Sequence, residues 1–234
     1  MIKVNDYIYT FPFEERRDRP NISVILGKNF NVLVDFGISE KHLDEVIDSF
    51  TKAGIEYPRV GVLTHYHYDH SFAIPFFKGI SIGCKRSNDY LKVLSSVPMN
   101  EAFVSSYLSG PALKFCLDAM HEEYSDFKDI KVKTTDVSFN NYLKLDLGDK
   151  IVELFHLPAP HSDDSVYVKA NDVLFIGDAF FYDIFNGETS FDKEKLKALY
   201  ALIEGFDVTT IVEGHSNIKT KNELLDEIQK EIEE

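Results

Sequence analysis

The chain has 234 residues, of which 44% are hydrophobic, and a formal net charge of −14. This length and apolar content suit one compact domain over residues 1–234, with room for an insertion. A chain this acidic lacks the basic surface that displaces counterions from phosphate groups, so we expect no nucleic-acid partner. It also contains no apolar run long enough to span a bilayer, and we therefore expect no membrane partner.

The N-terminal residues and the cysteines indicate the compartment. Residues 1–9 lack the charged start and the apolar centre of a secretory signal peptide. Cys84 and Cys116 are isolated and have no C-x-x-C spacing, which is typical of free thiols in a reducing environment. We therefore expect a cytoplasmic protein. Its oligomeric state stays open, with a homodimer as one alternative.

The first part of the chain predicts four strands and one helix. Apolar, β-branched runs predict strands at 6–10, 22–27, 32–34 and 59–63. Apolar residues recur at helical spacing from Ser39 to Phe50, with Ser39 as the N-cap and Gly54 beyond the end. His42 lies on the first turn of this helix, and we expect it at the surface.

The segment 11–20 separates the first two strands. It contains two prolines and six charged residues, which are typical of a loop. We expect Arg16, Arg17 and Arg19 in this loop to be solvated.

The residues that follow the fourth strand contain three of the chain's eight histidines and one carboxylate. In extended chain, residues two apart point to the same side, so His65 and His67 can reach one point. Asp69 and His70 lie past the bend and can reach a neighbouring point. Neutral imidazoles and carboxylates are the ligands that zinc accepts in catalytic sites. The spacing favours a metal site over a group of structural histidines in a polar turn.

The middle of the chain predicts a helical stretch between short strands. The expected elements are a short helix at 72–77, a strand at 80–84, a helical stretch at 87–128 and short strands within 131–157. Pro98 and Gly110-Pro111 divide the helical stretch into three pieces. His121 lies in a polar helix end and His156 inside a strand, so we expect both outside any site.

Three further polar candidates lie at strand ends in the last third of the chain. His161 lies in a turn after a strand, Asp178 follows a β-hairpin at 166–176, and His215 follows a strand at 209–213. A glycine directly precedes both Asp178 and His215. Capping residues open two helices, Asp192 for a helix through residue 203 and Thr220 for the last helix.

The pattern His65-x-His67-x-Asp69-His70 resembles the H-x-H-x-D-H signature of the metallo-β-lactamase superfamily, and the resemblance runs from about residue 2 to residue 218. It implies an α+β fold, a four-layer αββα sandwich with a helical insertion at about 87–128. It also implies two zinc ions per chain, with iron or manganese as alternatives. Carried over residue by residue, it assigns His65, His67 and His161 to one metal, Asp69, His70 and His215 to the other, and Asp178 to both.

The resemblance also implies roles for residues around the metals. Asp35 could orient a metal-binding histidine, with an ordinary turn aspartate as the alternative. Asp69 could orient the attacking water and relay its proton. Tyr182 could donate to an oxyanion, with a packed aromatic ring as the alternative. If the 11–20 loop covers the site, Phe11 and Phe13 could contact the substrate.

These features together imply a zinc-dependent hydrolase in which two metals activate water to cleave an ester, thioester, lactone or amide bond of a small molecule. Iron-dependent oxidoreduction, as in persulfide dioxygenases, β-lactamase activity and metal-bearing binding without turnover are the alternatives. The absence of a signal peptide and the presence of Asp178 argue against β-lactamase activity. The 87–128 stretch forms either a cap over the metals or ordinary helices packed on the sandwich.

Overall fold

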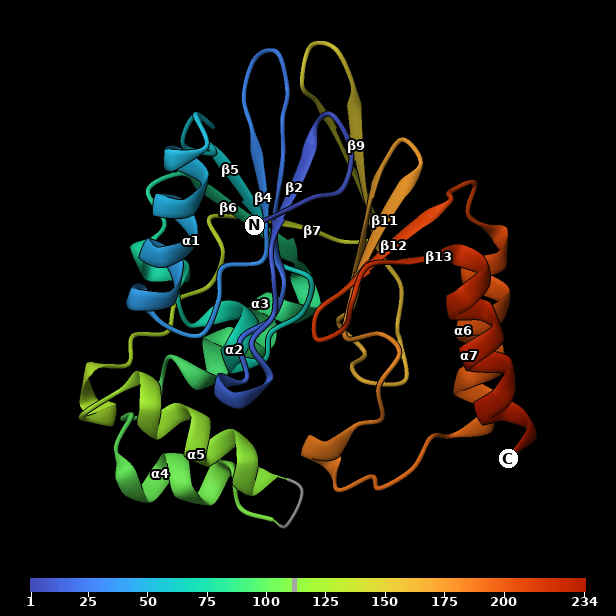
Figure 1. The fold of residues 1–234 in the computed structure, drawn as a ribbon. Coiled ribbons are helices and arrows are strands. Elements are labelled where there is room, and N and C mark those ends of the chain that lie inside the picture. The colour runs from blue at the N-terminus through green and yellow to red at the C-terminus, as the bar shows by residue number, and fades with distance from the viewer. Residues whose placement is uncertain (111–112) are drawn as a thin grey trace.

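Two β-sheets packed face to face form the centre of the protein, as a computed structural model describes it for residues 1–110 and 113–234 (Figure 1). Within these residues, the first sheet has seven strands in the order β1 to β7, and the second has six in the order β13-β12-β11-β10-β9-β8. The first sheet contains β1 (Ile2–Lys3), β2 (Ile8–Phe11), β3 (Ile22–Ile25), β4 (Val32–Val34), β5 (Val60–Val62), β6 (Ile80–Cys84) and β7 (Val137–Phe139). The second contains β8 (Tyr142–Asp146), β9 (Ile151–His156), β10 (Val166–Ala170), β11 (Val173–Gly177), β12 (Thr210–Glu213) and β13 (Lys219–Thr220).

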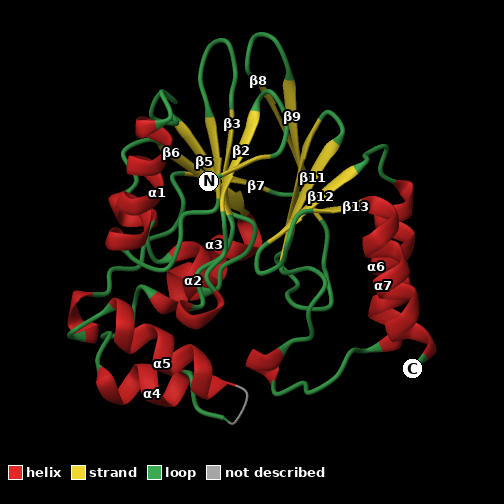
Figure 2. Cartoon of the chain, in the orientation of Figure 1, coloured by secondary structure: helices red, strands yellow, loops and turns green. Residues whose placement is uncertain are grey.

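Helices cover both outer faces of this sandwich (Figure 2). Helices lie on the outer face of each sheet and at one end of the sandwich. The helices are α1 (Glu40–Lys52), α2 (Tyr68–Ser71), α3 (Lys85–Leu94), α4 (Glu101–Tyr107), α5 (Lys114–Glu123), α6 (Lys193–Gly205) and α7 (Lys221–Glu233). The order helix, sheet, sheet, helix confirms the expected four-layer αββα sandwich. None of the helices in the described part of the chain has the length and apolar character that crossing a bilayer requires.

The sequence forms this sandwich because its strands are apolar on both faces. Along β3, Ile25 packs between the sheets while Val24 packs under α1. Along β11, Phe175 packs between the sheets while Leu174 packs under α6 and α7. Side chains alternate across a strand, so a strand covered on both faces reads as a continuous apolar run.

The described residues of the helical stretch after β6 form three helices, as expected. α3 ends at Leu94 and α4 begins at Glu101, which confirms a break around Pro98. The second break was expected at Gly110-Pro111, and Pro111 lies outside the described residues. The insertion has its own apolar cluster, which packs against Tyr68 and Phe72 beside α2. The short helix expected at 72–77 is instead α2 followed by a single 3-10 turn, Ile74–Phe76.

The surface position expected for His42 is wrong, because this side chain is fully buried. Its backbone N–H donates to the N-cap Ser39, as the sequence predicts for the start of α1. Its ring lies beside Phe11, with ring centroids 6.1 Å apart. The 11–20 loop folds back over the first turn of α1 and covers a face that the helix alone would expose. Burial lowers the pKa of His42 well below its usual value.

The expectation of a solvated loop is also wrong for Arg19, which is 2% exposed. Its guanidinium donates to Glu123 of α5 at 2.7 and 3.1 Å, and to Glu45 of α1 at 2.7 Å. Arg16 is exposed as expected, and it forms an ion pair with Glu122 at 2.6 Å. The loop is therefore bound to α1 and α5 by charged side chains.

Candidate metal centre

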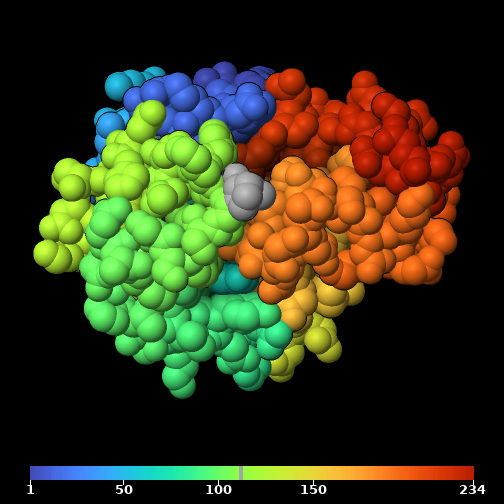
Figure 3. Space-filling view, turned by 90° about the horizontal axis from the view of Figure 1, so that it is seen from below, coloured from blue at the N-terminus to red at the C-terminus, as the bar shows by residue number. Residues whose placement is uncertain are grey.

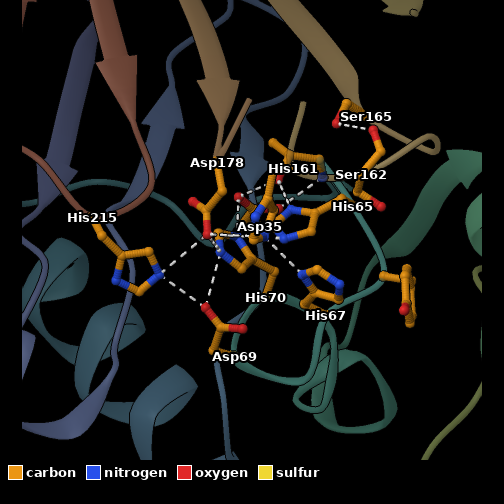
Figure 4. A network of polar contacts seen from close by, with 12 residues as sticks. Asp35, His65, His67, Asp69, His70, His161, Ser162, Ser165, Asp178 and His215 are labelled. Atoms are coloured by element: carbon orange, nitrogen blue, oxygen red, sulfur yellow. Dashed lines mark hydrogen bonds and ion pairs between the residues drawn. The ribbon is translucent and has the colours of Figure 1, made fainter. Parts of the chain in front are cut away.

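The seven candidate ligands gather at one edge of the sandwich, where strands of both sheets end (Figure 4). His65, His67, Asp69 and His70 lie between β5 and the end of α2. The other three follow strands of the second sheet, as His161 after β9, Asp178 after β11 and His215 after β12. The gathering confirms that these residues share one place, although they span 150 positions of the chain (215 − 65).

The first group consists of His65, His67 and His161, whose ligand atoms all lie within 4.8 Å of one another. His67 Nδ1 and His161 Nε2 are 2.9 Å apart. His65 Nε2 is buried and has no hydrogen-bond partner among the described residues. Burial, together with neighbouring imidazoles, lowers the pKa of His65 and of His67 well below the usual range. Both rings are therefore neutral, which is the form that binds metal ions.

The second group consists of Asp69, His70, Asp178 and His215, with ligand atoms within the same 4.8 Å. Asp69 Oδ2 lies 3.0 Å from His70 Nε2 and 2.9 Å from His215 Nε2. Burial would lower the pKa of His70, but Asp69, Asp178 and Asp35 raise it well above its usual value. The carboxylates thus favour positive charge at this point, which suits a bound cation.

Asp178 belongs to the second group and also faces the imidazoles of the first. Its Oδ2 atom is 3.4 Å from His70 Nε2, 3.6 Å from His215 Nε2, 3.8 Å from His161 Nε2 and 4.0 Å from His65 Nε2. Its Oδ1 atom is buried, and no described residue forms a hydrogen bond with it. One carboxylate that faces imidazole nitrogens of both groups, and that has an unpaired oxygen, fits a ligand shared by two ions. Imidazole and carboxylate donors suit zinc, and iron and manganese accept the same types.

The glycines that precede Asp178 and His215 are required by this close approach. A Cβ on Gly214 would lie 2.0 Å from Asp178 Oδ1 and would displace this carboxylate. Gly177 has φ +51°, and a Cβ there would lie 2.6 Å from Thr64 Oγ1. The Gly-Asp and Gly-His pairs of the sequence are therefore part of the site.

Asp35 orients His70, as the sequence predicts. His70 Nδ1 donates to Asp35 Oδ2 at 2.8 Å, so Nε2 faces the candidate ligands. The same carboxylate accepts from the backbone N–H of Thr64 at 2.8 Å and from its hydroxyl at 2.9 Å. Asp35 itself has φ +65°, a left-handed conformation that aspartate tolerates better than most residues. The alternative of an ordinary turn aspartate is wrong.

A cavity of about 690 Å³ lies over both groups. Phe13, Phe115 and Tyr182 line it, whereas Phe11 packs near His42. The carbonyl oxygen of Tyr182 accepts from His161 Nδ1 at 3.1 Å, so this residue orients a candidate ligand through its backbone. Donation from its hydroxyl to an oxyanion stays a prediction.

The aromatic residues of the 87–128 stretch divide between two places. Phe115 lines the large cavity, whereas Phe103 and Tyr107 line a separate small cavity beside Tyr68. Within the insertion, α5 lines the large cavity directly, and Tyr107 of α4 packs against the cavity residue Phe185, with ring centroids 5.8 Å apart. Whether this contact selects substrates stays a prediction.

Asp18 is a site residue that the sequence did not reveal. It lines the cavity, accepts a hydrogen bond from the Tyr68 hydroxyl and lies 3.9 Å from His215 Nδ1. Burial and the Asp69 charge raise the pKa of Asp18 to about 6. Glu213, Lys219 and Glu227 also line the cavity. No motif marks any of these four, which come from the 11–20 loop, β12, β13 and α7.

The remaining histidines and both cysteines lie where the sequence predicts. His121 is exposed, and His156 bonds to the carbonyl oxygens of Asn140 and Asp163. Cys84 and Cys116 are free and buried.

Comparison with known proteins identifies the family and the fold. The sequence matches the family model of the metallo-beta-lactamase superfamily over residues 16–215. No curated protein matches the chain by sequence. A metallo-beta-lactamase from Pontibacter korlensis has a similar structure, with a TM-score of 0.64 and 14% identity over 99% of this chain and 97% of its own.

Two other solved structures share this fold at similarly low sequence identity. The DIM-1 metallo-beta-lactamase has a TM-score of 0.65 and 16% identity, over 99% of this chain and 95% of its own. An archaeal metallo-beta-lactamase superfamily protein from Sulfolobus tokodaii has a TM-score of 0.62 and 19% identity, over 96% and 85%. Identities this low show the fold alone, whereas the family match covers most of the sequence. The chain therefore belongs to the metallo-beta-lactamase superfamily.

Proposed function

We propose that this protein is a zinc-dependent hydrolase with two metal ions, which cleaves an ester, thioester, lactone or amide bond of a small molecule. The position of Asp178 Oδ2 between the two groups of imidazoles supports this proposal most directly. His65, His67 and His161 would hold one ion, Asp69, His70 and His215 the other, and Asp178 both. When bound, the ions would lower the pKa of a water molecule and polarise the substrate carbonyl.

The chain's own residues would position the reactants and move the proton. Burial would raise the pKa of Asp69, but His70 and His215 lower it well below its usual value, so the carboxylate is ionised at neutral pH. It would orient the attacking water, accept its proton and deliver that proton to the leaving atom. The water oxygen forms a bond to the acyl carbon, and the bond from that carbon to the leaving atom breaks.

Asp35 and Tyr182 would support this reaction from outside the ligand set. Asp35 fixes the ring of His70, and the Tyr182 carbonyl fixes the ring of His161. The hydroxyl of Tyr182 would donate to the oxyanion that develops on the substrate. The aromatic walls of the cavity would exclude bulk water around the scissile bond.

The test combines metal analysis with a panel of substrates. Purified protein is analysed for zinc, iron and manganese and then assayed with an aryl ester, a thioester, a lactone, an anilide and a β-lactam. We expect about two zinc ions per chain and turnover of at least one acyl substrate, lost with a chelator and restored by zinc. Fully loaded protein that hydrolyses none of them would contradict the proposal. Oxygen consumption with a persulfide by iron-loaded protein would assign it to the oxidoreductases instead.

A further inference from the structure

The cavity over the candidate ligands has apolar walls formed by three segments. Phe13 comes from the 11–20 loop, Phe115 from α5, and Phe181 and Phe185 from the segment after β11. Phe115 and Phe181 are 43% and 42% exposed, although both are large apolar side chains. Figure 3 shows the yellow-green surface of α5 beside the orange surface of the segment after β11. Such walls favour a ligand with an apolar part that covers them.

The charged side chains in the cavity wall are nearly all acidic. Carboxylates of Glu15, Asp18, Glu213 and Glu227 line it in addition to those of the candidate ligands. Among the described lining residues, Lys219 is the only lysine or arginine. Recognition of a carboxylate or phosphate on a substrate commonly uses such a cation. Whether Lys219 is free or already paired with carboxylates therefore decides whether the wall can bind an anion.

Two carboxylates already bind Lys219. Its Nζ atom lies 2.7 Å from Glu213 Oε2 and 2.6 Å from Glu227 Oε2, and its side chain is 13% exposed. Burial would lower the pKa of Lys219, but Glu213 and Glu227 raise it, so the amine is charged at neutral pH. Two negative charges surround this one positive charge. The group as a whole repels an anion.

From this arrangement we propose that the site accepts uncharged esters or lactones with an apolar acyl part, and discriminates against substrates that carry a carboxylate, because Glu213 and Glu227 mask Lys219. This inference rests on the proposed hydrolase function and names its substrate class. Hydrolysis converts the uncharged substrate into a carboxylate, while the leaving oxygen takes a proton.

A matched pair of substrates tests the discrimination. In mono-(4-nitrophenyl) adipate, a carboxylate replaces the terminal methyl group of 4-nitrophenyl hexanoate, and the rest of the molecule is the same. At low salt we expect kcat/KM to be at least about tenfold higher for the hexanoate. Glu227→Gln removes one negative charge and should lower the ratio of the two kcat/KM values, hexanoate over adipate, about fivefold. High salt should also lower this ratio for the native protein, because it screens the charges.

Asp226→Asn is the matched control, because Asp226 is an exposed carboxylate on the same helix, α7, and does not line the cavity. It removes the same formal charge, and we expect the ratio to stay unchanged. Equal kcat/KM for both esters in the native protein would overturn the inference. The inference would also be overturned if Asp226→Asn changed the ratio of kcat/KM values as much as Glu227→Gln does.

A binding measurement separates this inference from the proposed function. Calorimetry with hexananilide and its carboxylate analogue, adipanilic acid, reports recognition, and chromatography of each mixture after the titration verifies that the anilide is intact. One outcome is that no ester is hydrolysed, that hexananilide binds about tenfold more tightly than adipanilic acid, and that Glu227→Gln reduces this difference in affinity. In that case the hydrolase proposal fails and the charge discrimination holds. If esters are hydrolysed while the two anilides bind equally, the hydrolase proposal holds and the discrimination fails.

Discussion

Replacing Arg19 with methionine tests the buried ion cluster that binds the 11–20 loop to the helices. Arg19 is 2% exposed and donates three hydrogen bonds, two to Glu123 and one to Glu45. The Glu123 side chain is fully buried, so methionine would leave its carboxylate without this cation. Removing one partner of a buried pair costs about 3–5 kcal/mol. The Ser39 hydroxyl still donates to Glu123 at 2.6 Å, so we expect a loss near the lower value.

Urea unfolding followed by circular dichroism measures this loss as a change in the free energy of unfolding. A loss of about 3 kcal/mol corresponds to a melting temperature lower by about 6–12 °C for a chain of this size. Arg16→Met is the control, because Arg16 forms an ion pair of similar length with Glu122 and is 63% exposed. Exposed pairs contribute about 1 kcal/mol or less, so this control should change little.

Equal losses for the Arg19 and Arg16 variants would refute the assignment of stability to burial of the pair. A second measurement checks the coupling itself. When Glu123→Gln accompanies Arg19→Met, the combined loss should be smaller than the sum of the two single losses, because the unpaired carboxylate is then gone. Additive losses would show that Arg19 and Glu123 act independently.

Three further predictions concern the metal centre and its cavity. Asp178→Ala should lower metal content and the rate of ester hydrolysis together, because this one side chain would bind both ions. Elemental analysis and ester assays measure the two effects, and an unchanged metal content would show that Asp178 is not a ligand. Asp69→Asn should preserve the circular dichroism spectrum but lower kcat at least about a hundredfold, because the amide cannot accept a proton; near-native turnover would contradict this role. Phe115→Ala should change the ranking of substrates by kcat/KM, whereas Phe103→Ala should only lower the melting temperature.

The sequence predicts which candidate ligands gather, because its chemistry is concentrated. Four candidates fall within six residues, and Asp178 and His215 each follow a glycine at the end of an apolar run. The structure explains both signals. β11 and β12 are parallel neighbours, so their ends meet at one edge of the sheet. Strand ends are thus visible in sequence, and the edge that they share follows from the fold.

The sequence could not identify residues whose partners lie far along the chain. The arginines of the 11–20 loop look alike in sequence, yet only Arg19 is buried, with partners 26 and 104 positions away. His42 is buried for the same reason, since the covering residue Phe11 belongs to another element. Asp18 reaches the site through a loop conformation that no local pattern encodes. The strand β1 has two residues, which is too short for a period to be recognised.

The candidate ligands come from both sheets, and this arrangement has a consequence for folding. His65 to His70 follow β5, whereas Asp178 and His215 follow strands of the other sheet. A complete site therefore exists only after the two halves of the chain have docked, and metal uptake would report the last stage of folding. An ion that binds only this docked state, at a hundred times its dissociation constant, would add about 2.7 kcal/mol of stability.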